Sequence, residues 1–240
     1  MFDKVLASVK IGAATVDTRL DQDTVQPGET LSTQVVVDGG EVDQDIRGIE
    51  LELETKREHG DVTETYALTS ERVAESFTIE EGEQRVFEVD LQIPYETPIT
   101  TINAKRGRSP KVWIDTDLEI DRAIDTDDTD YLSVEPTAPV QAMLDAVENA
   151  GNYLKEVTVD NDRISVGDET ANYPVDQEFV FKPQNGDYKE VEIHFLPRDT
   201  ATYVLVEFDY RMRSEQFHSI QINHDDYTVE YLQQEFERLA

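Results

Sequence analysis

Apolar and polar residues alternate with a period of two along most of the first 135 residues. In Ile49–Glu54 every apolar residue is followed by a glutamate, and Phe87–Ile93 and Val112–Ile120 repeat the pattern. Such a strand has one apolar and one charged face, as the outer layer of a β-sandwich requires. Gly and Pro turn signals separate the runs, so the spacing predicts about eight strands before residue 135.

The pattern changes at Glu135–Pro139, where EPTAP carries two prolines. After this boundary, apolar residues at helical spacing and Gly151 as a stop predict a short helix over about 139–150. Alternating runs then resume over 155–159, 177–181, 189–196 and 201–210. We therefore predict two domains, an N-terminal β-sandwich over 1–135 and a C-terminal β-sandwich over 136–240.

The last element is predicted to be a helix over about 226–239. Val229, Leu232, Phe236 and Leu239 form one apolar stripe at helical spacing. Asp225 and Asp226 precede the stripe and are candidates for capping the first turn. We expect this helix to lie against the second sandwich; the alternative is a free helix that binds a partner.

The chain is strongly acidic. Lys and Arg total 21 against 53 Asp and Glu, which gives a formal net charge of −32. The screening length falls from about 10 Å at about 0.1 M salt to about 3 Å at about 1 M, so molar salt silences repulsion between neighbouring surface charges. We interpret the chain as a folded protein adapted to molar salt, as in an extreme halophile; the alternative is an ordinary acidic protein.

Composition also narrows the classes of function. The chain has no cysteine, which excludes disulfides and thiolate metal sites. No apolar run approaches the ~20 residues of a membrane span, and the N-terminus lacks the apolar core of a signal peptide. Because so negative a surface repels phosphate backbones and anionic lipids, neither nucleic acid nor a membrane is an expected partner. We expect a cytoplasmic protein.

Several segments, in their order and spacing, carry a resemblance that covers nearly the whole chain. In the first half they are LASVKIGAATVDTRL, VVVDGGEVDQDIRGIELELET, PYETPIT and TDLEIDRAIDTDDTDYLSVEP. In the second half they are QEFVFKP and VEFDYRMR. With these segments the chain resembles the sporulation-control proteins of the SpoOM type, which are arrestin-like. The resemblance implies a mainly β fold of two tandem arrestin-like, immunoglobulin-like β-sandwich domains, with a short helix between them and a C-terminal helix.

Two turns within these segments have structural explanations. Gly39-Gly40 is expected to adopt the positive φ that a turn between strands requires; a loop that cradles a ligand is the alternative. Pro94 and Pro98 bracket the sequence YET, which predicts a fixed bend where the chain crosses between strands.

The densest acidic run, Asp115–Asp130, contains the candidate metal ligands. The part after Ala123 is expected to be a loop, where Asp125, Asp127 and Asp130 are candidates for binding Ca²⁺ or Mg²⁺. The run does not match an EF-hand, because the position that needs glycine is Asp130. A solvated, salt-adapted loop without a cation is the alternative.

The four histidines form no two-histidine metal motif. His194 falls with Glu190 and Glu192 on the polar face of a predicted strand, so we expect a surface residue rather than a general base. His224 adjoins Asp225 and Asp226. It could form a dyad with either acid; the alternative is that these residues have only surface and capping roles. No phosphate loop, dinucleotide fingerprint or nucleophile elbow is present in the sequence.

Basic clusters are rare in this chain and therefore informative. The strongest consists of Lys105, Arg106, Arg108 and Lys111, on a segment with Gly and Pro. Against the acidic background it is a candidate site for an anionic segment of a partner. The alternative is a loop whose cations are neutralised by the chain's own acids.

Two classes of function remain open at this stage. The first, which the resemblance favours, is a non-enzymatic regulatory adaptor or scaffold. It would bind protein partners through loops and sheet edges and self-associate through those edges. The second is a hydrolase or a Ca²⁺/Mg²⁺-dependent binding module on a sandwich scaffold, because fold does not fix function. We expect no catalytic residues and no cofactor other than such a cation.

Overall fold

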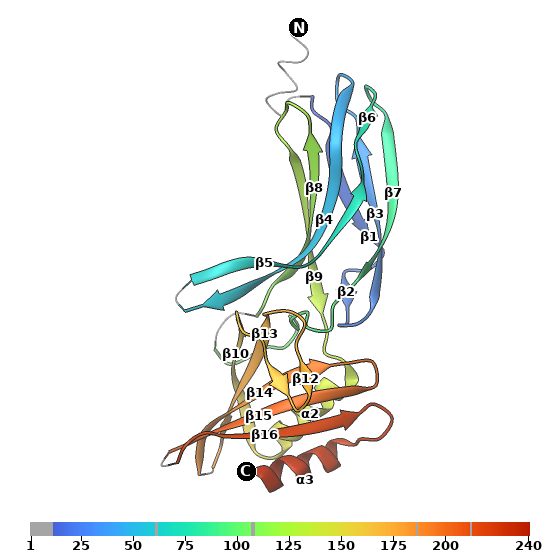
Figure 1. The fold of residues 1–240 in the computed structure, drawn as a ribbon. Helices are drawn as coiled ribbons and strands as arrows, with labels where there is room; N and C mark the ends of the chain where they lie inside the picture. Colours follow the sequence, from blue (N-terminus) through green and yellow to red (C-terminus); the bar gives the residue numbers. More distant parts are fainter. Residues whose placement is uncertain (1–11, 61, 107–108, 186, 212) are drawn as a thin grey trace.

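The computed structural model describes residues 12–60, 62–106, 109–185, 187–211 and 213–240, and within these ranges the protein is a mainly β structure with two helices (Figure 1). The strands of the first half are β1 (Thr15–Leu20), β2 (Thr24–Val25), β3 (Thr30–Asp38), β4 (Gln44–His59), β5 (Val62–Ala74), β6 (Phe77–Ile79), β7 (Gln84–Gln92), β8 (Val112–Ile120) and β9 (Thr126–Val134). The elements of the second half are α2 (Ala138–Asn149), β10 (Asn152–Asp160), β11 (Ser165–Val166), β12 (Glu169–Thr170), β13 (Asp176–Pro183), β14 (Tyr188–Pro197), β15 (Ala201–Tyr210), β16 (Gln216–Asn223) and α3 (Val229–Leu239).

One large curled sheet runs through both halves of the molecule. Its strands lie in the order β16-β15-β14-β13-β10-β4-β8-β9-β2, and β5 and β6 both pair with β4. The sheet is mixed, because β10 pairs with β4 and β2 with β9 in parallel, whereas the other pairs are antiparallel. A separate sheet of order β1-β3-β7 and the small β11–β12 hairpin complete the β structure.

The alternating pattern of the first half produces two sheet layers around one apolar core. In β4 the residues Ile49, Leu51 and Leu53 are fully buried, as the period of two predicts. They belong to the same hydrophobic cluster as Val35 and Val37 of β3, which lie in the sheet opposite. The first half therefore buries one apolar core between the β1-β3-β7 sheet and its part of the large sheet.

In the second half, helices cover the sheet where a second sheet was expected. Phe181 and Ile193 face a cluster that also contains Met143 of α2 and Leu232 and Phe236 of α3. The two helices also contact each other, and Figure 1 shows α3 running below β16. Periodicity predicted one apolar face on these strands correctly, but periodicity does not show whether a helix or a sheet covers that face.

Both predicted helices are present. The first spans Ala138–Asn149, against the predicted 139–150, with Pro139 in its first turn. The second spans Val229–Leu239 rather than 226–239, because its N-cap is Thr228, whose Oγ1 accepts a hydrogen bond from Tyr231 N at 3.1 Å. The capping role expected of Asp225 and Asp226 is therefore wrong. Neither of the two helices in the described ranges has the length and hydrophobicity of a membrane span.

Gly39 and Gly40 are required for a different reason from the one expected. Neither is among the described glycines with positive φ. Instead, a Cβ on Gly40 would lie 2.0 Å from the carbonyl oxygen of Gly12, and one on Gly39 would lie 2.3 Å from that of Glu80. Close approach of neighbouring backbone therefore excludes a side chain at both positions.

The division of the chain at residue 135 remains a prediction. Two hydrophobic clusters lie on either side of it, one drawn mainly from residues 14–134 and the other mainly from residues 140–236. Membership crosses the boundary in both directions, since Val159 and Val175 join the first cluster and Ile99 joins the second. The two halves therefore meet in a packed junction.

Candidate functional site

The connection between β7 and β8, residues 93–111, forms the centre of this junction. It leaves the first half at Ile93, crosses to the second half, and returns at Lys111. Near its start it carries Tyr95 and Glu96, which bind the second half through side chains. Near its end it carries the predicted basic cluster, so anchoring contacts and candidate binding residues lie on one segment.

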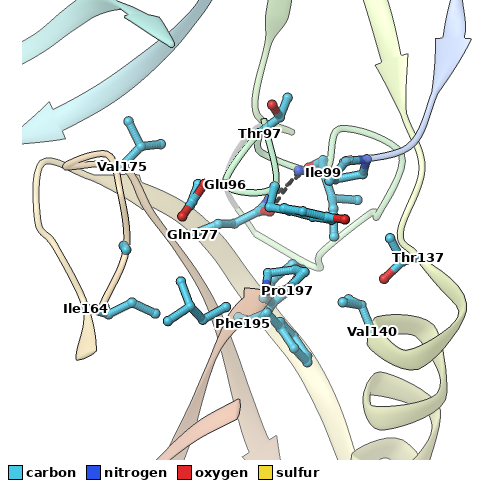
Figure 2. Close-up of a pocket in the computed structure, with 15 residues that line it drawn as sticks. Glu96, Thr97, Ile99, Thr137, Val140, Ile164, Val175, Gln177, Phe195 and Pro197 are labelled. Carbon is cyan, nitrogen blue, oxygen red and sulfur yellow. Dashed lines mark hydrogen bonds between the residues drawn. The ribbon is translucent and has the colours of Figure 1, made fainter. Parts of the chain in front are cut away.

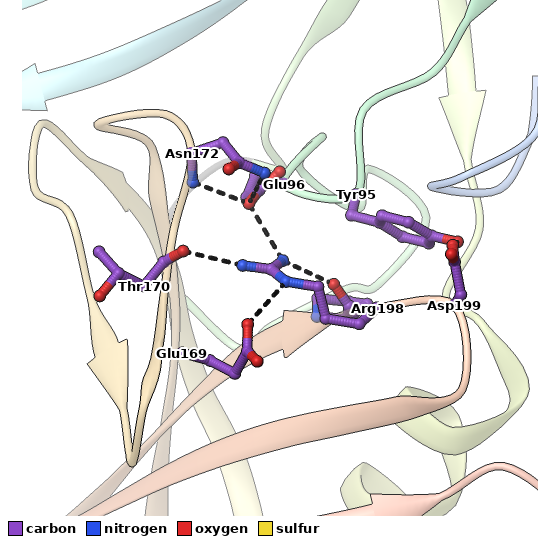
Figure 3. Close-up of polar contacts among 8 residues, drawn as sticks. Tyr95, Glu96, Glu169, Thr170, Asn172, Arg198 and Asp199 are labelled. Atoms are coloured by element: carbon purple, nitrogen blue, oxygen red, sulfur yellow. Dashed lines mark hydrogen bonds and ion pairs between the residues drawn. The ribbon is translucent and has the colours of Figure 1, made fainter.

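Glu96 is the most connected acid of the junction. It is 9% exposed, and its Oε1 accepts hydrogen bonds from the backbone N and the side-chain Nδ2 of Asn172 at 3.0 and 3.2 Å (Figure 3). The same oxygen forms an ion pair with Nη1 of Arg198 at 3.2 Å. A buried carboxylate is tolerated only with such compensation, so Arg198 and Asn172 are required partners.

Arg198 extends the network to the β11–β12 hairpin. Its Nη2 donates to the carbonyl oxygen of Thr170 at 2.9 Å, and its Nε pairs with Glu169 at 3.3 Å. Nη1 also donates to the carbonyl oxygen of Pro197 at 2.8 Å. One guanidinium thereby holds the connection, the hairpin and the end of β14 together, which uses the fixed fork geometry of arginine.

Tyr95 makes a second contact across the junction. Its hydroxyl donates to Oδ1 of Asp199 at 2.6 Å, and this hydrogen bond, followed by burial, raises the pKa of Tyr95. The ring also explains why residue 28 is glycine. A Cβ on Gly28 would lie 2.4 Å from a ring carbon of Tyr95, and the φ of +91° already disfavours any other residue.

A small cavity lies beside this network (Figure 2). Gln177 closes one side by bonding both backbone groups of Ile99, accepting from its N and donating to its O, each at 2.8 Å. The cavity holds about 30 Å³ and is lined largely by apolar side chains, among them Val140 and Phe195. Ligand pockets of enzymes have about 300–1,000 Å³, so this cavity has room for a few waters at most and for no substrate.

Two of the residues that line this cavity have a hydroxyl without a hydrogen-bond partner in the described ranges. Thr97 Oγ1 and Thr137 Oγ1 are both buried without a hydrogen bond to any residue of the described ranges, and both residues line the cavity. Buried hydroxyls normally bond protein or ordered water. The space and the two polar atoms together suit a bridging water, which would complete the junction rather than perform chemistry.

A larger groove lies on another side of the junction, where β10 separates from β4. The two strands pair only at Asp160 with Glu58, so a wedge remains between them. The resulting groove of about 390 Å³ includes Lys56 and Lys111 in its lining. Its other lining residues are Glu58, Thr63, Ser109, Pro110, Val157, Thr158 and Val159.

Of the predicted basic cluster, Lys111 lines this groove, and Lys105 and Arg106 contact strand β10. Arg106 N donates to the carbonyl oxygen of Lys155 at 2.8 Å, and Lys105 Nζ lies 3.6 Å from the ring centre of Tyr153. Lys111 lines the groove itself, whereas Arg108 lies outside the described residues. In the part of the chain that is described, no acidic side chain lies within 4.0 Å of the charged groups of Lys105, Arg106 or Lys111, so the alternative of a self-neutralised loop is not observed.

The structure does not bring the three predicted metal ligands together. Strand β9 begins at Thr126, so the expected loop is mostly strand and successive side chains point to opposite faces. Asp127 and Asp130 therefore leave opposite faces of β9. Asp125 Oδ1 accepts from Ile120 N at 2.8 Å and pairs with Arg47 at 3.4 Å. Asp125 is held by these local contacts, whereas Asp130 has a buried Oδ2 without a hydrogen-bond partner in the described ranges.

The histidines also differ from expectation. His194 was expected at the surface but is 6% exposed, with Nδ1 at 2.9 Å from Oδ2 of Asp176. Burial alone would lower the pKa of His194, but the hydrogen bond to Asp176 and the neighbouring carboxylates outweigh it and raise the pKa. His224 pairs with Thr202 Oγ1 at 3.1 Å rather than with its acidic neighbours in sequence.

The sequence did not indicate Glu96, Arg198 and Lys56 as functional residues. The bend PYETPIT pointed to the right segment, but it gave no partner for its glutamate. Lys56 adjoins Arg57 near the end of an alternating strand, and only the fold brings it to the same groove as Lys111. Such contacts depend on strand register, which one sequence does not reveal.

Geometry and comparison together define the class of protein. The chain is a mainly β protein in which a large curled mixed sheet is joined to two helices, with an ion-paired junction at its centre. A model of the SpoOM protein family matches residues 2–212, and the chain belongs to this sporulation-control family. The family that the sequence motifs indicated is therefore confirmed.

Two relatives show how far the likeness extends. The sporulation-control protein spo0M of Bacillus subtilis (strain 168) is 36% identical over 225 residues, which cover 88% of this chain and 81% of that protein. The crystal structure of Spo0M, sporulation control protein, from Bacillus subtilis is similar with a TM-score of 0.81 at 30% identity. That likeness covers 95% of this chain and 98% of the solved chain, so the whole architecture is shared.

Proposed function

We propose that the chain is a non-enzymatic regulatory adaptor that acts by binding protein partners in the cytoplasm. Membership of the sporulation-control family supports a regulatory role, and the resemblance to arrestin-like proteins supports a two-domain scaffold. The groove between β4 and β10 is the docking site of this proposal.

The observation that carries the proposal is the pair of cations in that groove. With a net charge of −32, most described basic side chains form an ion pair with a nearby acid. Lys56 and Lys111 form none within 4.0 Å in the described ranges, although both line the groove. Cations without an ion-pair partner in so acidic a chain are suited to carboxylates of another molecule.

The occupant that fits best is an extended acidic segment of a partner protein. The groove combines the two lysines with an apolar floor that includes Val157 and Val159, both buried in the unbound protein. At molar salt long-range attraction is screened, so binding depends on close ion pairs and apolar contact at the same place. A long wedge with both features favours an extended peptide over a compact ligand.

The junction network gives this groove a fixed shape. The connection that contributes Lys111 to the groove is anchored at its other end by Glu96 and Tyr95. Arg57, next to Lys56 in β4, donates to the carbonyl oxygen of Pro174 at 2.8 Å, which ties the groove wall to the second half. A preformed wall reduces the ordering that a peptide must impose on binding.

Site-specific photo-crosslinking tests the proposal. A photoreactive residue at Thr63, within the groove, is expected to crosslink a partner in native cells of the source organism. The crosslinked peptide, identified by mass spectrometry, is expected to be acidic. The recombinant partner should then bind the purified chain in molar KCl, and Lys56→Glu with Lys111→Glu should weaken binding by at least about tenfold, or about 1.4 kcal/mol.

The matched control reverses two exposed cations outside the groove, Arg163→Glu with Arg213→Glu. This variant has the same change in net charge, so a general electrostatic effect would weaken both variants equally. Specific loss in the groove variant supports the docking site. The proposal is contradicted if both variants lose the same affinity. It is also contradicted if the crosslinked segment has no acidic residues and binds the groove variant as tightly as the wild type.

Self-association through a sheet edge is a second interaction that we propose. Strand β16 ends the large sheet, so its outer edge presents unpaired backbone groups, and Phe217 on this strand is 59% exposed. Phe217→Glu should shift the chain toward monomer in sedimentation velocity at molar KCl. Tyr231→Glu, which charges another exposed aromatic on α3, should leave the distribution unchanged; a wild-type chain that is monomeric at all concentrations contradicts the proposal.

A further inference from the structure

A polar cluster lies on strands β13, β14 and β15 of the large sheet, on the face away from the helices α2 and α3. Glu178 of β13 lies directly opposite His194 of β14, and Glu192 lies two residues before His194 on the same face. Glu192 lies in turn opposite Glu207 of β15. Three acids and one imidazole therefore share neighbouring positions on one surface of the sheet.

His194 differs from the other members of this cluster because it is buried. It is 6% exposed, so more than nine-tenths of its surface is covered. Its Nδ1 lies 2.9 and 3.1 Å from the two oxygens of Asp176, a carboxylate that is itself 7% exposed. A carboxylate at this position accepts a hydrogen bond from Nδ1–H, which leaves Nε2 as the ring nitrogen that can bind a metal ion.

No described residue donates to or accepts from Nε2 of His194. One ligand atom each from Glu178, Glu192 and His194 lies within 4.8 Å of the others, and in the described ranges no other group of three potential metal ligands is this close. The convergence of a largely buried imidazole, held by Asp176, with two carboxylates is a separate observation from the acidity of the face.

The cluster also lacks a lysine or arginine partner. In the described ranges no lysine or arginine forms an ion pair within 4.0 Å of Glu178 or Glu192. The charged groups that act on Glu178 are Glu192, His194, Asp160 and Asp176, so three of the four are acids. Partly buried carboxylates with mostly acidic neighbours are costly unless something positive lies between them.

We propose that Glu178, Glu192 and His194 form a binding site for a divalent transition metal ion of the Zn²⁺ kind. One imidazole with two carboxylates is a ligand set for zinc, and three protein ligands leave a place for water. Asp176 acts as a positioning residue, because it orients the imidazole and fixes its tautomer. The site is separate from the Asp125–Asp130 run and from the groove.

The nitrogen ligand supplied by His194 favours one class of cation over another. Ca²⁺ and Mg²⁺ prefer six or more oxygen ligands, and this cluster supplies two carboxylates and a nitrogen. Zn²⁺ accepts nitrogen and oxygen together in a four-coordinate arrangement, whereas Mn²⁺ is bound more weakly by the same ligands. We therefore expect Zn²⁺ to bind most tightly, Mn²⁺ more weakly, and Ca²⁺ not at all.

Calorimetry on the full chain, without a histidine tag and after removal of metals, tests the site. Titration of Zn²⁺ in molar KCl should show saturable binding of a single ion per chain. Co²⁺ should then give the visible absorption bands of a low-symmetry, nitrogen-containing site, which report coordination without any activity assay. The absence of saturable heat with Zn²⁺ and of such bands with Co²⁺ would overturn the proposal.

Conservative variants locate the binding. His194→Gln and Glu178→Gln should each abolish the heat and the Co²⁺ bands, with folding checked by circular dichroism. Asp176→Asn should keep binding but weaken Zn²⁺ affinity by about 10–100-fold, as loss of an orienting carboxylate does. If His194→Gln does not fold, Glu178→Gln decides alone.

Asp117→Asn with Asp127→Asn is the matched control. These two acids lie directly opposite each other on β8 and β9, so the control also removes neighbouring carboxylates from a sheet surface. It should bind Zn²⁺ like the wild type. Equal loss in the control and in Glu178→Gln would show diffuse attraction by the acidic surface, and the proposed site would be wrong.

Discussion

Arg198 Nη1 lies 3.2 Å from Oε1 of Glu96, an ion pair between residues 102 positions apart in the chain. The Glu96 side chain is 4% exposed and that of Arg198 is 22% exposed, so the pair is largely withdrawn from water. Surface pairs contribute little to stability, but removing one partner of a buried pair leaves an uncompensated charge. The junction between the halves therefore depends on both residues.

Replacing Arg198 should destabilise the protein far more than replacing another arginine. Arg198→Met is expected to lower the free energy of unfolding by about 3 kcal/mol, because Glu96 stays buried without its cation. Adding Glu96→Gln should recover part of this loss, since the buried charge is then removed as well. Denaturant unfolding in molar KCl measures both values.

Arg163→Met serves as the control, because Arg163 is exposed and forms no ion pair with a described residue. Its expected effect is within about 0.5 kcal/mol, the usual range for surface changes. If Arg198→Met and Arg163→Met have the same small effect, the ion pair does not hold the junction.

Salt should stabilise the protein, because acids face each other across strand pairs. Glu52 of β4 lies directly opposite Asp115 of β8, and burial followed by the neighbouring acids raises the pKa of Glu52. Like charges placed this way are destabilising, and molar salt reduces the screening length to about 3 Å. The melting temperature should therefore rise from low to molar KCl.

The double variant Glu52→Gln with Asp115→Asn should melt higher than the wild type at low KCl and equally at molar KCl. Asp225→Asn, at an exposed position after β16, should change the salt dependence very little. A wild-type melting temperature that stays flat or falls with KCl would refute adaptation to molar salt. Thermal scans followed by circular dichroism give all three curves.

Periodicity predicted the strands whose buried face is strongly apolar. Strand β15 was predicted with its observed bounds, Ala201–Tyr210, because Val206, Phe208 and Tyr210 alternate with Glu207 and Asp209. Strand β16 was not predicted. Its buried positions are mainly Ile220 and Ile222, and two apolar residues are too weak a signal for alternation.

The positions of the polar sites depend on strand register and on which elements cover a sheet face, and the period of the sequence pattern shows neither. Periodicity placed His194 correctly on the face of Glu192, but it did not show that the face is partly covered. Leu205, directly opposite His194, packs with the cluster of Val166 and Ala171 from the β11–β12 hairpin. That hairpin has two-residue strands, which leave no pattern in a sequence.

Stability should fall as pH rises through the range in which Asp130 titrates. Burial and the adjacent Asp128 carboxylate raise the pKa of Asp130 from 3.8 to about 6. Between these values the folded state binds more protons than the unfolded state, so the free energy of unfolding decreases with increasing pH. Its Oδ2 is buried and has no hydrogen-bond partner in the described ranges, consistent with a carboxyl that favours the neutral form.

Asp130→Asn keeps this position neutral at every pH. The variant should therefore be more stable than the wild type near neutral pH, and its stability should decrease less between about pH 4 and about pH 6. Asp168→Asn, in the exposed turn of the β11–β12 hairpin, is the control and should follow the wild-type curve. A wild-type stability that increases with pH through this range, with no change in Asp130→Asn, would contradict the assignment.

The hydrogen bond that the Thr228 side chain accepts should stabilise the start of α3. Its Oγ1 accepts from Tyr231 N at 3.1 Å, and the helix places Leu232 and Phe236 in the core of the second half. Thr228→Ala is expected to reduce stability by about 1 kcal/mol, whereas Thr228→Ser keeps the acceptor and should lose far less. Amide hydrogen exchange should show faster exchange in the first turn of α3 for the alanine variant alone. Equal exchange in both variants would mean that packing of Leu232 and Phe236, rather than the cap, determines where this helix begins.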